Sequence, residues 1–318
     1  MIRILANDGI DDDGKMLLEE AEYEVITDHI PQEELAKALP GFDVLIVRSA
    51  TKVRKELIDL CPRLKIIARG GVGMDNIDVE YAVSKGIEVI NTPQASTRSV
   101  AELTMGHIFA LSRFLHRSKA DMTGSKSDFK KLKAEFGAGH EIAGKVLGIL
   151  GFGRIGQETA KLAMGAGLRI LPYDPYVSET VLNFDIFDNA NLNLALNVHT
   201  VELETVLAKS DFISLHLPLT NGQSVITKSE INKMKEGVII INCARGGVID
   251  EDALLEGLNT GKIGGAGLDV FMNEPTPNKA ILDHPNVSIS PHIGGSTIEA
   301  QAKIGRELAD KIITFLED

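Results

Sequence analysis

Residues 151–156, with the sequence GFGRIG, follow the apolar run Val146–Leu150 and precede a helix-length stretch that continues to Ala166. Glycines at this spacing permit a tight turn, a close approach of the backbone to a pyrophosphate, and anion binding by the first N–H groups of the helix. Asp174 lies 174 − 156 = 18 positions beyond the last glycine, which is where a dinucleotide site places an acid against the adenosine ribose. These features predict a dinucleotide site that includes Gly151, Gly153, Arg154, Ile155, Gly156, Asp174 and Pro175.

The acidic residue of this site also selects the kind of cofactor. An ionised Asp174 would repel a 2′-phosphate, and neither Pro175 nor Tyr176 supplies an arginine that could bind one. NAD is therefore predicted in preference to NADP. The alternative, a glycine-rich turn without a ligand, would leave the combination of strand, helix and spaced acid unexplained.

Three further polar residues follow apolar runs in the second half of the chain. They are Arg245 after residues 238–242, Glu274 after residues 264–268, and His292 after residues 287–290. Taken singly, Arg245 is better interpreted as a surface cation, Glu274 as a solvated acid and His292 as a packed histidine. Because ligands of open α/β sheets bind beyond the carboxyl ends of strands, the three side chains could instead converge on one crevice, where they would supply a proton donor and acceptor.

Composition narrows the classes of partner. The chain has 33 basic and 45 acidic residues, a net charge of −12, and no tryptophan, so binding to nucleic acid or to an anionic membrane is not expected. The two cysteines, Cys61 and Cys243, are 243 − 61 = 182 positions apart and show no metal-ligand spacing. No apolar run approaches the roughly 18 residues of a membrane helix, and the N-terminus lacks a long apolar leader, so a cytoplasmic location is expected.

Short apolar runs alternate with helix-length amphipathic segments along nearly the whole chain, which is typical of parallel βαβ units and predicts an α/β fold. The predicted strands are Ile2–Leu5, Glu24–Thr27, Val44–Val47, Lys65–Ala68, Ile87–Ile90, Val146–Leu150, Leu168–Tyr173, Phe212–Leu215, Val238–Asn242, Gly264–Leu268 and Val287–Ser290. The predicted helices include Asp12–Glu20, Pro31–Leu39, one long helix over Thr97–Ser118, and Thr297–Leu316. A surface hairpin is predicted for the Asn-rich stretch 184–197.

Several longer motifs resemble the signatures of one enzyme family. Residues 242–247 (NCARGG), residues 268–275 (LDVF leading to EP) and residues 290–297 (SPHIGGST) resemble the D-2-hydroxyacid dehydrogenase family, and the likeness extends over essentially the whole chain. Residues 48–52 (RSATK), 69–76 (RGGVGMDN) and 91–93 (NTP) most resemble the phosphoglycerate dehydrogenases within that family.

The resemblance implies roles for particular residues. His292 would be the general acid and base, Glu274 its partner, and Arg245 the residue that holds the carboxylate or carbonyl oxygen of the substrate. Further cofactor contacts would come from His216, Leu217, Pro218, Cys243, Ala244, Asp269, Gly294 and Gly295. Substrate contacts would come from Arg48, Ser49, Arg69, Val72, Gly73 and Lys131, although a scattered pair of surface arginines is the competing interpretation of Arg48 and Arg69.

The family likeness also implies an architecture of two doubly wound parallel-sheet domains. A Rossmann NAD domain, residues 98–292, would be inserted into a flavodoxin-like substrate domain made of residues 1–97 and 293–318, with the catalytic cleft between them. A homodimer through the NAD domain is expected. Because the chain ends at Asp318, it is not expected to carry the serine-binding regulatory domain of many phosphoglycerate dehydrogenases.

The function predicted in this way is NAD-dependent oxidation of 3-phospho-D-glycerate to 3-phosphohydroxypyruvate and the reverse reaction, the first step of L-serine synthesis. Two alternatives are a dehydrogenase for glyoxylate, hydroxypyruvate or another small D-2-hydroxyacid, and an NAD-sensing binding protein like the corepressors that resemble this fold. His107 is predicted to be packed within its helix. Cys243 is predicted to line the cofactor pocket, where its oxidation would impair NAD binding.

Overall fold

The computed structural model describes residues 1–125, 127–184, 194–219 and 222–317. The chain forms two compact units, one made of Met1–Ser99 and Gly295–Asp318 and the other of Val100–Gly294. The predicted domain boundaries, after residues 97 and 292, lie two residues from these limits. Among the described residues, no helix is both long enough and apolar enough to span a membrane.

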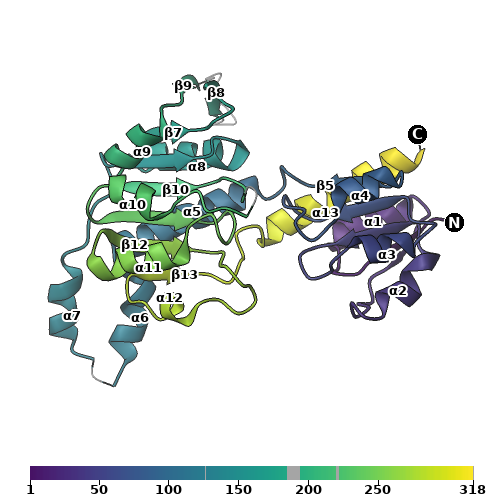
Figure 1. Ribbon diagram of the computed structural model, residues 1–318, viewed down its shortest axis with the longest axis horizontal. Coiled ribbons are helices and arrows are strands. Elements are labelled where there is room, and N and C mark those ends of the chain that lie inside the picture. Colours follow the sequence, from purple (N-terminus) through teal and green to yellow (C-terminus); the bar gives the residue numbers. More distant parts are fainter. Residues whose placement is uncertain (126, 185–193, 220–221, 318) are drawn as a thin grey trace. The chain divides into compact units, whose positions relative to one another are not determined.

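The first unit is built on a five-stranded parallel sheet with the order β2-β1-β3-β4-β5 (Figure 1). Its strands are β1 (Arg3–Ala6), β2 (Glu24–Ile26), β3 (Val44–Val47), β4 (Ile66–Arg69) and β5 (Glu88–Asn91). Its helices are α1 (Asp12–Glu20), α2 (Leu35–Ala38), α3 (Lys55–Asp59), α4 (Val79–Ser84) and α13 (Ile298–Glu317). This strand order is that of flavodoxin-like folds, which confirms the predicted class of this part of the chain.

The last helix belongs to this unit because it packs on the sheet and on α1. Ile304, Leu308 and Ile312 of α13 join the core cluster that contains fully buried strand residues such as Ile4. A Cβ atom on Gly14 of α1 would lie 2.4 Å from the backbone of Gly305, so the two helices cross at a contact that only glycine permits.

The second unit is built on a six-stranded parallel sheet with the order β13-β12-β11-β10-β6-β7. Its strands are β6 (Val146–Leu150), β7 (Arg169–Tyr173), β10 (Phe212–Leu215), β11 (Val238–Asn242), β12 (Ile263–Leu268) and β13 (Val287–Ile289). From β6 the chain moves to β7 at one edge of the sheet, and it then returns to β10 on the other side of β6 and continues to the opposite edge. A topological switch point therefore lies beside the carboxyl ends of β6 and β10. The predicted Rossmann-type, doubly wound class is confirmed.

The helices of this unit are α5 (Thr97–Ser112), α6 (Leu115–Thr123), α7 (Phe129–Phe136), α8 (Arg154–Gly165), α9 (Leu203–Lys209), α10 (Lys228–Lys233), α11 (Glu251–Thr260) and α12 (Lys279–Leu282), although the first residues of α5 belong to the other unit. Figure 1 shows α6 and α7 extending beyond the sheet of their unit. Helix starts carry the expected caps: the Asp250 carboxylate accepts backbone N–H groups at the start of α11, and Thr227 and Glu230 form a capping box at α10.

The single helix predicted over Thr97–Ser118 is wrong. The chain breaks between α5 and α6, where Phe114 adopts a left-handed conformation with φ of 56°. The Phe114 ring stacks on Phe136 of α7 at 5.3 Å, and His116 contacts the carbonyl oxygens of Ala110 and Pro285, at 3.2 Å and 3.0 Å. Contacts with distant residues therefore override a helical pattern that is continuous in sequence.

Two other expectations are corrected or completed. A helix was predicted over Pro31–Leu39, but the structure has only the short helix α2, which a 3-10 turn over Leu39–Gly41 follows. In the Asn-rich stretch, β8 (Glu179–Phe184) and β9 (Leu194–His199) pair in antiparallel register, as expected of a hairpin. The part of that prediction that falls on residues 185–193 lies outside the described residues.

Candidate active site

The glycine-rich segment lies at the switch point of the second sheet and has the geometry that a pyrophosphate requires. Gly151 has a φ of 93°, and a Cβ atom on it would lie 2.6 Å from the carbonyl oxygen of His216, so no other residue fits. A Cβ atom on Gly153 would meet nothing within 4 Å, and Gly153 provides no side-chain cap for α8. Open space beside Gly153, at the positive end of the α8 helix dipole, therefore fits a dinucleotide.

Asp174 directly follows β7 and is held against this segment. Its Oδ2 accepts the N–H of Phe152 at 2.7 Å, and its Oδ1 accepts those of Tyr176 at 2.8 Å and Val177 at 3.1 Å. The side chain is half-buried, so its remaining lone pairs stay accessible to a ribose. Three backbone donors fix the carboxylate in place before any ligand arrives.

Further predicted cofactor residues follow β7, β10 and β11. His216 follows β10, its Nε2 lies 2.8 Å from the Ser214 hydroxyl, and burial lowers its pKa to about 4, so the ring is neutral at pH 7. Leu217 and Ala244 are half-buried, and Pro175 and Pro218 are exposed. Cys243 is 8% exposed, and burial raises the pKa of its thiol to about 12.

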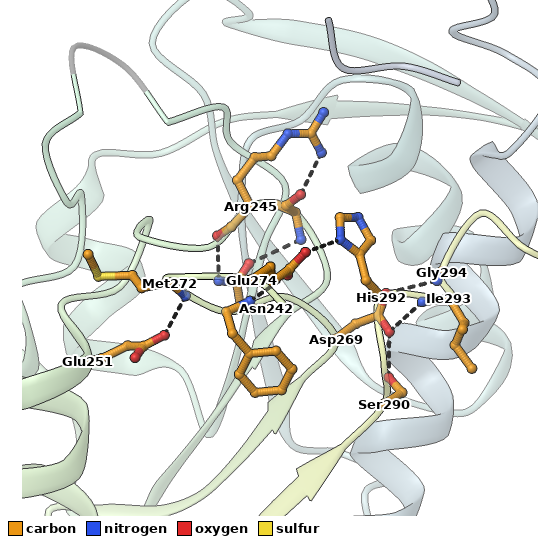
Figure 2. Close-up of polar contacts among 12 residues, drawn as sticks. Asn242, Arg245, Glu251, Asp269, Met272, Glu274, Ser290, His292, Ile293 and Gly294 are labelled. Carbon is orange, nitrogen blue, oxygen red and sulfur yellow. Dashed lines mark hydrogen bonds and ion pairs between the residues drawn. The ribbon is translucent and has the colours of Figure 1, made fainter. Parts of the chain in front are cut away.

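His292 and Glu274 form a direct pair (Figure 2). Nδ1 of His292 lies 2.8 Å from Oε2 of Glu274, and the other oxygen of Glu274 accepts the N–H of Phe271 at 2.9 Å. Because a carboxylate accepts only, Nδ1 carries the proton, and Nε2 is the nitrogen left to exchange a proton with a substrate. Both side chains retain solvent access, with 47% and 36% exposed.

Arg245 is positioned by a turn that Asn242 closes. Asn242, which is 3% exposed at the end of β11, accepts the N–H of Ala244 at 3.0 Å and donates its side-chain amide to the carbonyl oxygen of Arg245 at 2.9 Å. Gly246 allows this turn to pass the carbonyl oxygen of Phe271, which a Cβ atom would approach to 2.0 Å. The turn therefore runs beside the segment that carries Glu274, and Figure 2 draws Arg245, Glu274 and His292 in one close-up.

Asp269, predicted as a cofactor contact, also organises the chain around His292. It follows β12, is 1% exposed, and accepts the N–H groups of Ile293 at 2.9 Å and Gly294 at 2.8 Å. These two residues directly follow His292, whose backbone has a left-handed φ of 55°. A less populated backbone conformation at the histidine is thus held by two hydrogen bonds to one buried carboxylate.

The predicted substrate residues of the first unit lie at the carboxyl ends of β3 and β4. Val47 pairs with Arg69 in the parallel register, and Arg48 follows β3 directly, so both arginines lie at one edge of the sheet. Asp8 accepts the N–H of Arg48 at 2.7 Å and the hydroxyl of Thr51 at 2.6 Å, which fixes the segment that includes Ser49. A cavity of about 250 Å³ within this unit is lined by Asp8, Gly9, Ile10, Asp11, Arg48, Gly70, Gln301, Ile304 and Leu308.

The glycine-rich segment after β4 follows the same edge. Gly71 has a φ of 141°, and a Cβ atom there would overlap the Arg69 guanidinium at 1.8 Å, so the arginine side chain lies across this turn. Val72 is 37% exposed, and its carbonyl oxygen accepts the side-chain amide of Asn91 at 2.8 Å. Gly73, the next residue, is half-buried, and Gly295 belongs to this unit, where its carbonyl oxygen accepts the side-chain amide of Gln301.

Lys131 has a different setting. It is exposed on α7, at a helix start capped by Asp128, and lines a hollow of about 380 Å³ between α6 and α7. The residues that line this hollow do not include Arg245, Glu274 or His292. Within the second unit, the structure therefore does not bring Lys131 into the group formed around His292.

Sequence reasoning did not assign a role to Asn242 or to Glu251. Glu251 lies at the start of α11 and accepts the N–H of Met272 at 2.7 Å, which anchors the segment before Glu274. The available signal for Asn242 was its place at a strand end before Ala-Arg-Gly-Gly, where an Asx turn is common. Glu251 gave no such signal, because its partner lies 21 positions away.

Comparisons with known proteins agree with this geometry. The family described as D-isomer specific 2-hydroxyacid dehydrogenase, NAD binding domain, matches residues 105–294. The chain is 46% identical to hydroxypyruvate reductase of Thermotoga maritima, over 99% of this chain and 98% of that protein. It is 43% identical to D-3-phosphoglycerate dehydrogenase of Methanocaldococcus jannaschii, over 98% of this chain but 57% of that protein, so it spans little more than half of that relative.

A solved structure shows the same fold over the full chain. The TT0316 protein of Thermus thermophilus is 30% identical and has a TM-score of 0.84, over 99% of this chain and 97% of that one. A family match over more than half of the chain, together with a full-length relative at 46% identity, leaves one conclusion. The chain belongs to the D-isomer-specific 2-hydroxyacid dehydrogenase family, and residues 105–294 match the NAD-binding domain of that family.

Proposed function

We propose that this dehydrogenase interconverts 3-phospho-D-glycerate and 3-phosphohydroxypyruvate, the entry reaction of L-serine synthesis. The observation that supports this substrate is the pair of arginines, Arg48 and Arg69, at the carboxyl ends of neighbouring strands. Guanidinium groups bind phosphate with paired, charge-assisted hydrogen bonds. The net charge of −12 makes such a local cluster necessary for a strongly anionic substrate.

His292 performs the proton transfer in this proposal. In oxidation, its Nε2 removes the proton of the C2 hydroxyl, and in reduction the same nitrogen returns a proton to the C2 carbonyl oxygen. Glu274 keeps the proton on Nδ1 and stabilises the imidazolium that forms in oxidation. NAD, when bound by the segment Gly151–Gly156 and Asp174, supplies or accepts the hydride.

Arg245 orients the substrate in this scheme. Its guanidinium would hold the carboxylate or the C2 oxygen, and the Asn242 turn limits how far the residue can move. The backbone N–H groups at Val72 and Gly73, in a glycine-rich turn with an exposed valine, are candidates for the substrate carboxylate. Each of these assignments is a proposal for the residue named.

A second candidate reaction is the reduction of hydroxypyruvate. It is favoured by the 46% identity to hydroxypyruvate reductase, a protein that this chain covers almost completely. Hydroxypyruvate has the same carboxylate and C2 carbonyl group, but its C3 hydroxyl is neutral. Arg48 and Arg69 would then contribute little to the recognition of the substrate.

The two candidates are separated by initial rates of NADH oxidation with 3-phosphohydroxypyruvate, hydroxypyruvate, glyoxylate, pyruvate and 2-oxoglutarate at equal concentrations. We expect the highest kcat/KM with the phosphorylated acid. The Arg48→Gln variant should lower that kcat/KM by about 10- to 100-fold while changing the value for hydroxypyruvate little. Arg63→Gln is the matched control, because Arg63 pairs with Asp43 and is not at this edge.

A preference of the wild-type enzyme for hydroxypyruvate, with no effect of Arg48→Gln, would discard the phosphate assignment and keep the dehydrogenase. Inactivity with all five acids despite NADH binding would instead favour an NAD-sensing binding protein.

The assembly and the location also belong to this proposal. We propose a homodimer formed through the NAD-binding unit, supported by exposed apolar side chains on α5 to α7, namely Phe109, Leu115, Met122 and Phe129. A monomeric mass in light scattering would contradict it. We further propose that residues 1–97 and 293–318 bind the acid, that residues 98–292 bind NAD, and that the enzyme acts in the cytoplasm.

A further inference from the structure

A buried histidine outside the proposed active site is connected to it by hydrogen bonds. His107 of α5 is 4% exposed and lies against β12, where a Cβ atom on Gly267 would approach the Cβ of His107 to 2.6 Å. Its Nδ1 lies 2.9 Å from the hydroxyl of Ser288, and its Nε2 lies 3.1 Å from the hydroxyl of Ser290. Both ring nitrogens thus meet residues that shortly precede His292 in the chain.

The directions of these hydrogen bonds follow from counting protons. The Ser290 hydroxyl has a single proton, which it donates to Oδ1 of Asp269 at 2.6 Å, so its oxygen must accept from His107. Burial lowers the pKa of His107, so the ring is neutral and has one N–H group. That group is therefore Nε2–H, and Nδ1 is left to accept the proton of the Ser288 hydroxyl.

The chain of bonds ends at the backbone that carries His292. Asp269 accepts from Ser290, Ile293 and Gly294, and these three donors share its two carboxylate oxygens. A carboxylate that is 1% exposed needs such donors, because an ionised group without them is costly to bury. Figure 2 shows Asp269 with Ser290 on one side and with Ile293 and Gly294 on the other.

We propose that His107 is a positioning residue for catalysis: by donating its Nε2 proton to Ser290, it directs the Ser290 hydroxyl to Asp269, which holds the Ser290 side chain before His292 and the backbone N–H groups directly after it. The backbone of His292 then keeps its left-handed conformation, and its imidazole keeps the hydrogen bond to Glu274. This inference rests on the proton-transfer role proposed for His292. His107 itself touches neither substrate nor cofactor in this assignment.

Substitutions at position 107 can separate this role from simple packing. The amide nitrogen of glutamine can replace Nε2 as the donor to Ser290, whereas asparagine is too short to reach it and leucine has no polar atom. We expect His107→Leu and His107→Asn to lower kcat by about 10- to 100-fold, and His107→Gln to restore most of it. Because Asp269 and Gly294 are predicted cofactor contacts but Gly151–Gly156 and Asp174 lie outside the chain of bonds, the dissociation constant of NADH should change by a smaller factor than kcat in all three variants.

Leu111→Ala is the matched control for packing. Leu111 lies one turn further along α5, is 6% exposed, and contacts the same strand at Gly265. This variant should lower Tm at least as much as His107→Leu, because it opens a cavity, but it should leave kcat nearly unchanged. Equal rates for His107→Leu and wild type, or equal rescue by asparagine and glutamine, would overturn the proposal.

Two further measurements complete the test. Because His107 acts through Ser290, the double variant His107→Leu with Ser290→Ala should lose no more kcat than Ser290→Ala alone, and additive losses would contradict a shared path. ¹⁵N-histidine NMR without substrate should show His107 as the neutral Nε2–H tautomer at pH 7, because burial lowers the pKa of the ring. It should also show the Nδ1–H signal of His292 weakened in His107→Leu and retained in His107→Gln.

The NMR result does not depend on the substrate. An Nδ1–H tautomer of His107, or a His292 signal that is insensitive to His107→Leu, would refute the positioning role even if every acid in the substrate comparison were inactive. The correct tautomer with an inactive enzyme would instead count against the proposed function.

Discussion

Glu274 contacts His292 through Oε2 at 2.8 Å and holds the N–H of Phe271 through Oε1 at 2.9 Å, so one carboxylate joins the histidine to the segment after β12. The pair is partly exposed, which means that the orientation of the imidazole depends on this bond more than on surrounding side chains. The nitrogen that the bond leaves free, Nε2, is the one that the proposed reaction uses.

Replacing this carboxylate should therefore impair turnover. We expect Glu274→Gln to lower kcat by about 10- to 100-fold, because an amide is neutral and does not stabilise an imidazolium beside it. Steady-state rates in both directions, with the dissociation constant of NADH as the control, test this. A variant with wild-type kcat would show that Glu274 is structural only.

Replacing the histidine should have a larger effect. For His292→Asn we expect kcat to fall by roughly two to four orders of magnitude, because the proton acceptor at Nε2 is removed. NADH binding, measured by the fluorescence of NADH itself, should stay nearly intact. Turnover close to that of the wild type would remove His292 from the proton-transfer role.

The choice between NAD and NADP should depend on Asp174. We expect Asp174→Ala to weaken NADH binding and to reduce the discrimination against NADPH by about tenfold, because the negative charge that repels a 2′-phosphate is lost. Ratios of kcat/KM for the two cofactors measure the effect. Asp174→Asn is the control, since it removes the charge but keeps an oxygen that can accept from the N–H of Phe152. An unchanged ratio in both variants would place recognition of the ribose elsewhere.

The thiols should be unreactive in the folded enzyme, so the oxidation of Cys243 that is predicted to impair NAD binding should be slow there. Burial raises the pKa of Cys61 to about 11 and that of Cys243 to about 12, so almost no thiolate exists near neutral pH. We expect dithionitrobenzoate to label neither cysteine at pH 8 until the protein is unfolded in guanidinium. Rapid labelling of the native enzyme with loss of NADH affinity would restore the oxidation hypothesis.

His216 should make the fold less stable in acid. Its pKa is about 4 in the folded chain, against 6.5 for the ordinary side chain, so the unfolded state binds more protons between these values. The stabilisation is complete above pH 6.5 and is lost as pH falls towards 4, by about 3 kcal/mol for this group. Plots of Tm against pH for the wild type and for His216→Gln should differ in slope between pH 4 and pH 6.5. Parallel pH profiles would contradict the assignment.

Much of the fold could be predicted from the sequence because its signals are local. The apolar runs at Val44–Val47, Val146–Leu150, Phe212–Leu215 and Val238–Asn242 form strands with the predicted bounds. The glycines before α8 form a turn that has no room for a side chain at Gly151, so their spacing alone predicts the turn. The acidic residue after the next strand then identifies NAD as the cofactor.

Features that depend on residues far apart could not be predicted in this way. The break at Phe114 depends on the ring of Phe136 in α7, a helix that was not predicted because it begins in a lysine-rich stretch. Periodicity within a window carries no information about such partners.

By itself, the pattern of the sequence determined an α/β fold, a dinucleotide loop and the strand ends where polar residues accumulate, because backbone conformation and apolar periodicity act over a few residues. The division into two doubly wound parts was implied by the family likeness. Only the tertiary structure decided how these residues are held. His107 meets Ser288 across 181 positions, and Asp269 holds Gly294 across 25. Such bonds form only after the sheet has set its register, because hydrogen bonds require an approach of about 3 Å that spacing along the chain does not encode.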